Sequence, residues 1–197
     1  MPISLPVECN SELHPERLAV VAQWLLEELY ATEDDLARET DSAYTRGCTA
    51  FGRQMNRIKF KALSGEYEWL ALLNGGNDLV FTIGGVPCRF SNDDPSNPSK
   101  DAVIATSRYQ MPFLEFVDEG QPGKFCFIID RGSNNLEDPR VEFLGFSPSG
   151  EIACRWVSDS VRVLRDVVAD PVAPVQLDKP VVAPKKRGDD ASIEAEA

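Results

Sequence analysis

Three aspartates beside predicted strands have the type and placement that metal chemistry needs. Asp93 and Asp94 stand in the polar run SNDDPSNPSKD, and Asp130 ends the apolar run KFCFIID. Hard divalent cations take oxygen ligands, and a metal held by acids activates water in nucleases. With Asp78 as a fourth candidate, these carboxylates predict an enzyme acting on nucleotides or phosphodiesters. Such nucleases carry an E-x-K pair on a neighbouring strand. In the run VEFLGF, Glu142 has no lysine two positions on, which weakens the prediction of a metal-dependent nuclease.

The same aspartates have ordinary structural interpretations. NDDP is a typical turn sequence, since aspartate side chains bond nearby backbone amides. Asp130 is followed by Arg131, and Arg155 lies on a later predicted strand, so either arginine is a candidate partner for its carboxylate. These interpretations are favoured over the metal site.

Histidine-based catalysis has one candidate residue. His14 is the only histidine and stands before Pro15, where a helix is expected to begin. The sequence has no H-E-x-x-H, P-loop, G-x-S-x-G or G-x-G-x-x-G motif. We therefore expect no cofactor, and we lean against an enzyme.

A basic run is the strongest anomaly in an acidic chain. The formal net charge is −12, yet residues 43–61 carry five cations and no acid: Arg46, Arg53, Arg57, Lys59 and Lys61. The spacing predicts a helix over about 41–63, ending at Ser64–Gly65, whose packed face is made of Tyr44, Cys48, Phe51, Met55, Ile58 and Ala62. At about 100° per residue the three arginines fall opposite that face, with Lys61 at its flank.

Three roles remain open for this arginine ridge. It pairs with acids of 32–41 or is solvated, it contacts a protein, or it contacts phosphates, with Gln54 and Asn56 to either side. The acidic net charge disfavours nucleic acid. The candidate partner contacts are Arg46, Arg53, Arg57, Lys61 and Arg89.

The elements that position these residues follow from periodicity. Residues 15–31 form an amphipathic helix, and TEDDLARET a separate capped turn or short helix beginning at Thr32. DLVFTI-GG-VPCRF predicts a hairpin closed by Gly84–Gly85, in which Ile83 pairs with Val86. Pro87 lacks an amide hydrogen, so its strand is expected at an edge or with its free side there.

The remaining predicted strands are EYEWLALL, KFCFIID, RVEFLGF and EIACRWV. Together they predict an α+β fold in two layers, with N-terminal helices (11–64) on a mostly antiparallel sheet of about six strands (66–157). A short helix over 158–169, capped by Ser158 or Asp159, closes a single domain of residues 1–170. Residues 171–197 read as a flexible tail rich in proline, alanine and charge.

The leading functional hypothesis is a non-catalytic protein-binding regulator or inhibitor, similar in role to an antitoxin or a mobile-element factor. It would act through its acidic surface or an exposed sheet edge. The N-terminus has no secretory signal pattern, and no run reaches the roughly 20 apolar residues of a membrane span. Five scattered cysteines without a C-x-x-C pair are typical of reduced thiols, so we expect a cytoplasmic protein.

Overall fold

The computed structural model describes residues 3–111, 121–131 and 138–159. Their central feature is one sheet of six strands, in the order β1-β2-β3-β4-β5-β6. The strands are β1 (Leu70–Asn74), β2 (Val80–Ile83), β3 (Val86–Asn92), β4 (Lys124–Asp130), β5 (Arg140–Phe146) and β6 (Ile152–Val157). Only β3 and β4 pair in parallel, and the other neighbours are antiparallel. The predicted α+β class with a mostly antiparallel sheet is confirmed.

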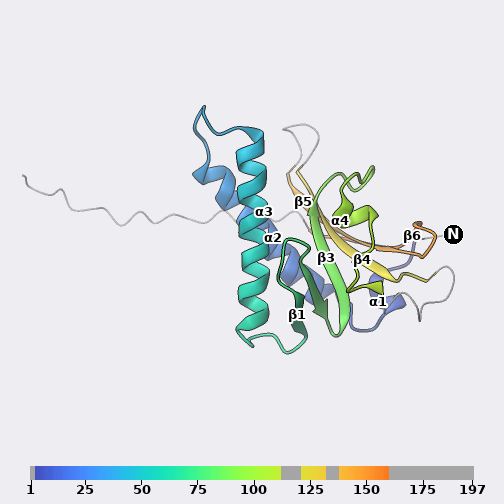
Figure 1. The fold of residues 1–197 in the computed structure, drawn as a ribbon. Coiled ribbons are helices and arrows are strands. Elements are labelled where there is room, and N and C mark those ends of the chain that lie inside the picture. The colour runs from blue at the N-terminus through green and yellow to red at the C-terminus, as the bar shows by residue number, and fades with distance from the viewer. Residues whose placement is uncertain (1–2, 112–120, 132–137, 160–197) are drawn as a thin grey trace, which may run out of the picture. The chain divides into compact units, whose positions relative to one another are not determined.

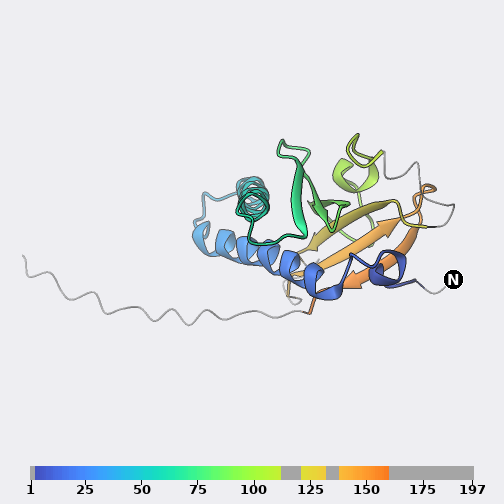
Figure 2. The same cartoon turned by 90° about the horizontal axis from the view of Figure 1, so that it is seen from below.

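Helices cover one face of this sheet (Figures 1 and 2). They are α1 (Pro6–Cys9), α2 (Pro15–Asp35) and α3 (Ala43–Leu63). In Figure 2, α2 runs beneath the sheet and α3 is seen end-on beside β1 and β2. The main core lies between these helices and the sheet face that bears Phe81, Phe125, Phe127 and Phe143, all buried.

The second face of the sheet is covered by the connection between β3 and β4. This connection contains the one-turn helix α4 (Asp101–Ile104), which lies on the opposite side of the sheet from α2 (Figure 2). Val103 of α4 packs in a smaller buried cluster with Cys126, Ile128, Leu144 and Phe146. Both faces of the central strands are therefore buried.

The predicted hairpin has the expected register. Ile83 is opposite Val86 and Phe81 is opposite Cys88. Gly84 and Gly85 have φ values of +56° and +86°, and positive φ at both positions is what a type I′ hairpin turn requires. The strand that contains Pro87 is not at an edge, because β3 has neighbours on both sides. Its pairing with β4 begins one residue later, at Cys88, so the proline has its free side there.

Two helix predictions need correction. Residues 32–35 do not form a separate capped turn but the last turn of α2, where the buried Thr32 hydroxyl donates to the Glu28 carbonyl (2.7 Å). The predicted helix over 41–63 does form: Ser42 caps α3 by accepting from the Thr45 amide (3.1 Å), and α3 ends at Leu63 before Ser64. Of the six residues predicted for its packed face, Phe51, Met55, Ile58 and Ala62 pack against the core, whereas Tyr44 and Cys48 are exposed.

The predicted closing helix and the tail over 171–197 lie outside the described residues, apart from Ser158 and Asp159. Ser158, predicted as a helix cap, exchanges backbone and side-chain hydrogen bonds with Val141 instead. None of the helices in the described part of the chain has the length and apolar character required to cross a membrane.

Candidate functional site

The arginine ridge of α3 faces α2 rather than solvent. Arg53 Nη1 lies 2.7 Å from the Asp35 carboxylate, and Arg57 Nη2 lies 3.1 Å from that of Glu27. Arg57 Nε is also 3.8 Å from Glu28. The acids of α2 are spaced along the side that α3 crosses, so two of the ridge's arginines join the two helices.

The other two predicted cations of α3 are also engaged within the chain. Arg46 Nη1 donates to the Asp41 backbone carbonyl (2.5 Å). Lys61 Nζ forms a 2.7 Å ion pair with Glu66, and it lies 5.8 Å and 5.5 Å from the ring centres of Trp24 and Tyr67. The ridge therefore holds α3 in place, and its charge is largely neutralised by the chain itself.

Gln54 was predicted beside the ridge but is completely buried. Its amide nitrogen donates to the Leu25 carbonyl of α2 (2.9 Å), and its amide oxygen accepts from Asn92 at the end of β3 (2.7 Å). The buried stripe of α3 is Ala50, Gln54 and Ile58. This polar contact joins α2, α3 and the sheet, and the only sequence signal for it is the four-residue spacing of those three residues.

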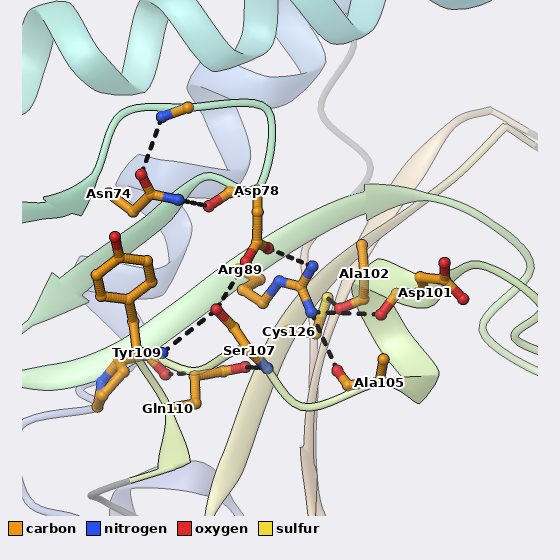
Figure 3. A network of polar contacts seen from close by, with 12 residues as sticks. Asn74, Asp78, Arg89, Asp101, Ala102, Ala105, Ser107, Tyr109, Gln110 and Cys126 are labelled. Carbon is orange, nitrogen blue, oxygen red and sulfur yellow. Dashed lines mark hydrogen bonds and ion pairs between the residues drawn. The ribbon is translucent and has the colours of Figure 1, made fainter.

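Arg89, the fifth predicted contact residue, is buried on the second face of the sheet (Figure 3). It is 8 % exposed, and its guanidinium is 2.5 Å from the Asp78 carboxylate. Arg89 Nη1 also donates to the carbonyls of Asp101 (3.3 Å) and Ala105 (3.0 Å). Arg89 therefore holds the α4 segment on the sheet and offers no surface for a partner.

Further polar contacts tie the same segment to the sheet. The Ser107 hydroxyl donates to the second oxygen of Asp78 (2.7 Å; Figure 3). The buried Gln110 amide nitrogen lies 3.4 Å from the Pro87 and Phe125 carbonyls. Lys124 Nζ donates to the Ile104 carbonyl (3.0 Å), and burial holds its pKa below the ordinary lysine value. Lys124 thereby satisfies a carbonyl that a one-turn helix leaves free, as Arg89 does for Ala105.

The carboxylates predicted to bind metal are used by the fold. Asp93 accepts from the backbone amides of Ser99 and Lys100 (2.9 Å each), and Asp94 accepts from the Ser96 amide (2.8 Å). Asp130 Oδ2 is 3.3 Å from an Arg140 nitrogen, a partner that neither predicted pairing named.

Burial raises the pKa of Asp93, but its backbone hydrogen bonds outweigh burial and leave the pKa below the ordinary value. Among the described residues, no group of three or more histidines, cysteines or acids is arranged to hold a metal ion. His14 is exposed at the start of α2.

The side of α3 turned away from the core carries unusual exposed apolar groups. The exposed residues of this helix, which together we call the outer face of α3, are Ala43, Tyr44, Thr45, Cys48, Asn56, Phe60 and Leu63. Tyr44 is 80 % exposed, Leu63 74 % and Phe60 66 %. These are the three most exposed large hydrophobic side chains among the described residues.

Sequence reasoning placed Tyr44 and Cys48 on the packed face of this helix, and the structure corrects both. Cys48 is exposed. A hydrogen bond between the Cys48 thiol and the Tyr44 hydroxyl raises the pKa of Tyr44 above its ordinary value. In Figures 1 and 2 no other element of the described chain lies on the outer side of α3. The outer face of α3 is the candidate functional site.

The sequence predicts an exposed sheet edge that could accept a strand of a partner, but both edges of the observed sheet are poorly suited to this. β1 has five residues, with a register shift between Leu72 and Asn74. On the β6 edge, Ser4 pairs with Cys154: the Ser4 amide donates to Ala153 and its carbonyl accepts from Arg155. Short, bulged or covered edges resist the addition of another strand.

Comparisons with protein-family models, with curated proteins and with solved structures each find no match. The assignment of a function therefore depends on the geometry of this chain alone.

Proposed function

We propose that this protein is a non-catalytic protein-binding domain, acting as a regulator or inhibitor, and that it binds through the outer face of α3. One observation carries the proposal: the three most exposed large hydrophobic side chains among the described residues all lie on α3, two of them, Phe60 and Leu63, one turn apart. Exposed apolar residues that are scattered need no explanation, whereas a contiguous group marks an interaction site.

The energetics of such a surface favour binding. Covering an exposed Phe or Leu side chain fully is worth roughly 1.5–3 kcal/mol, and aromatic residues are common centres of binding energy. Tyr44 and Phe60 provide two aromatic groups sixteen positions apart, close to the two ends of α3. At about 100° per residue these two lie about 160° apart around the helix axis, whereas Leu63 is one turn from Phe60, so a partner at that end of α3 would contact Phe60 and Leu63 together.

The alternative functions have less support. A nucleic-acid contact through Arg46, Arg53 and Arg57 would compete with the hydrogen bonds and ion pairs these residues make within the chain. A carboxylate metal enzyme would need Asp93 to leave two backbone amides. Binding through the acidic surface and a cytoplasmic location stay predictions.

Site-specific photo-crosslinking in the native cell tests the proposal. A photoreactive phenylalanine analogue is placed at Phe60, and a matched control places it at Ile104, which is 57 % exposed on the opposite side of the sheet. We expect one protein to be crosslinked from position 60 and not from 104, and the crosslink to disappear in Leu63→Asp. Equal crosslinking from both positions, or persistence in the variant, would refute the proposal.

A further inference from the structure

We propose that Cys9 and Cys154 are a redox-active pair of thiols, which a small-molecule disulfide such as oxidised glutathione converts into a disulfide bond between α1 and β6. This inference goes beyond the proposed function and does not depend on the outer face of α3. It rests on the contact between the two thiols, on the space around Cys154 and on the different accessibility of the two side chains.

The two thiols meet because the N-terminal segment folds back onto β6. Ser4 pairs with Cys154 in an isolated parallel bridge, and α1, which follows Ser4, lies against β6 (Figures 1 and 2). Cys9 is the last residue of α1 and packs against the main core, to which Cys154 belongs. A hydrogen bond joins the two thiols. A disulfide, in which the sulfurs are about 2 Å apart, brings them closer without changing which elements are neighbours.

The sheet leaves room for the Cys154 sulfur at Gly145. This glycine of β5 is directly opposite Cys154 in the register of β5 and β6. A Cβ atom added at Gly145 would lie 2.5 Å from the Cys154 sulfur, which is closer than real contacts allow. Any other residue at position 145 would therefore displace the thiol, so the glycine keeps Cys154 in its place beside Cys9.

The two thiols differ in accessibility, which gives them different roles. Cys9 is partly exposed, whereas Cys154 is completely buried. Burial raises the pKa of both thiols, and the hydrogen bond from Cys154 offsets part of this rise for Cys9, whereas the pKa of Cys154 reaches about 12. The thiolate is the reactive form of cysteine. Cys9 is therefore the thiol that reacts with the oxidant, and Cys154 is the one that completes the bond.

Oxidation proceeds by two successive thiol–disulfide exchanges. The Cys9 thiolate attacks one sulfur of oxidised glutathione, forms a mixed disulfide and releases one glutathione thiolate. Cys154 loses its proton to solvent, attacks the Cys9 sulfur and displaces the second glutathione thiolate. The protein gives up two electrons and two protons, and one oxidised glutathione becomes two reduced molecules. The part of the raised Cys154 pKa that is due to Cys9 disappears in the mixed disulfide, which favours the second exchange.

The bond would fasten the N-terminal segment over the β6 edge. In the reduced chain the Ser4 amide donates to the Ala153 carbonyl (3.3 Å), and the Arg155 amide donates to the Ser4 carbonyl (3.0 Å). A covalent link between residues 9 and 154 would close most of the described chain into one loop. Long loops restrict the unfolded chain most, so oxidation would stabilise the fold and keep the β6 edge covered.

Oxidation of the full chain carrying Cys48→Ser tests the inference. This background removes an exposed thiol that would otherwise form mixed disulfides of its own. After incubation with oxidised glutathione we expect a mass loss of two hydrogens, no bound glutathione and a proteolytic peptide that links Cys9 to Cys154. Hydrogen exchange at the Arg155 amide should slow, and the urea midpoint should rise by about 1–2 M, the shift expected of a long closed loop. Dithiothreitol should reverse both changes.

Cys9→Ser in the same background is the matched control, because it replaces a partly exposed thiol by a hydroxyl. We expect oxidised glutathione to leave its mass and its urea midpoint unchanged, and circular dichroism confirms that it folds. If it does not fold, the peptide map of the Cys48→Ser chain still decides the question.

Four results would overturn the inference. No reaction at Cys9 would mean that oxidants do not reach this thiol. Glutathione that stays on Cys9 would mean that Cys154 cannot complete the bond. A link between Cys154 and the completely buried Cys88 would identify a different pair. An unchanged urea midpoint after the expected link has formed would mean that the bond does not fasten the N-terminal segment.

Discussion

The ion pair between Arg89 and Asp78 allows a prediction in which the two partners are not equivalent. The Arg89 side chain is 9 % exposed, whereas that of Asp78 is 43 % exposed. Breaking a buried pair from one side costs about 3–5 kcal/mol, chiefly because the other charge is left buried and unpaired. The partner that remains after each substitution therefore decides its cost.

Asp78→Asn leaves the Arg89 cation buried with only its two carbonyl bonds. We expect a loss of about 3 kcal/mol of unfolding free energy, the lower end of the range, because solvent screens the half-exposed site. Arg89→Met leaves a carboxylate that can hydrate, and two carbonyls without their donor. We expect a loss of about 1–2 kcal/mol from those carbonyls.

Urea denaturation of both single variants and of the double variant measures these costs. The double variant is expected to be about as stable as Arg89→Met, since the amide at position 78 then faces no buried charge. The reasoning is refuted if Arg89→Met is the more damaging change. It is also refuted if the two losses add, which would mean that the pair is not coupled.

Three further predictions concern other polar groups. Replacing the buried Gln54 by Leu is expected to lower the unfolding free energy by about 1–3 kcal/mol, because it leaves the Asn92 amide group without its acceptor. Urea denaturation measures this loss, and an unchanged denaturation midpoint would contradict the prediction. At pH 8 a thiol reagent is expected to modify the exposed Cys48 rapidly and the buried Cys126 slowly, since burial raises the pKa of Cys126 to about 12; equal rates by mass spectrometry would count against the described burial. The Asp93 carboxylate has a lowered pKa, so the stability it contributes is present above its ordinary pKa of about 3.9 and is lost as the pH falls through the lowered value. The difference in unfolding free energy between the wild type and Asp93→Asn is expected to be constant above about pH 5 and to disappear towards pH 2. A difference that persists at pH 2 would refute this cause.

Local signals account for the parts of the fold that could be predicted. The Gly84–Gly85 turn determines the β2–β3 register, because a two-residue hairpin leaves no freedom in the pairing. The predicted runs KFCFIID and RVEFLGF coincide with β4 and β5. Each of these signals lies within a few residues of the feature it predicts.

The contacts of α3 could be predicted only in part. Phe51, Met55, Ile58 and Ala62 pack as their spacing predicts, but that spacing gives no sign that Tyr44 and Cys48 lie exposed near the start of the helix. Arginine suggests exposure by type, yet the long side chains of Arg53 and Arg57 reach acids on another helix. Arg89 was misplaced for a similar reason, because the segment that covers it is distant in sequence and has no periodic pattern.

The single parallel pairing, between β3 and β4, has a consequence for the order of folding. It divides the sheet into two antiparallel halves, β1 to β3 and β4 to β6, each built from strands that follow one another closely in sequence. Local pairings form early because they close short loops, whereas the β3–β4 junction must close a longer one. Two half-sheets would then exist before the junction forms.

Gln110 lies at that junction, with its amide near one carbonyl of each half. Its contacts would form after the rate-limiting step. We therefore expect Gln110→Ala to accelerate unfolding and to leave the folding rate nearly unchanged, which a chevron plot records. If Gln110→Ala slows folding as much as it accelerates unfolding, the two half-sheets already pair before the rate-limiting step. The folding kinetics of this variant therefore show when β3 and β4 pair.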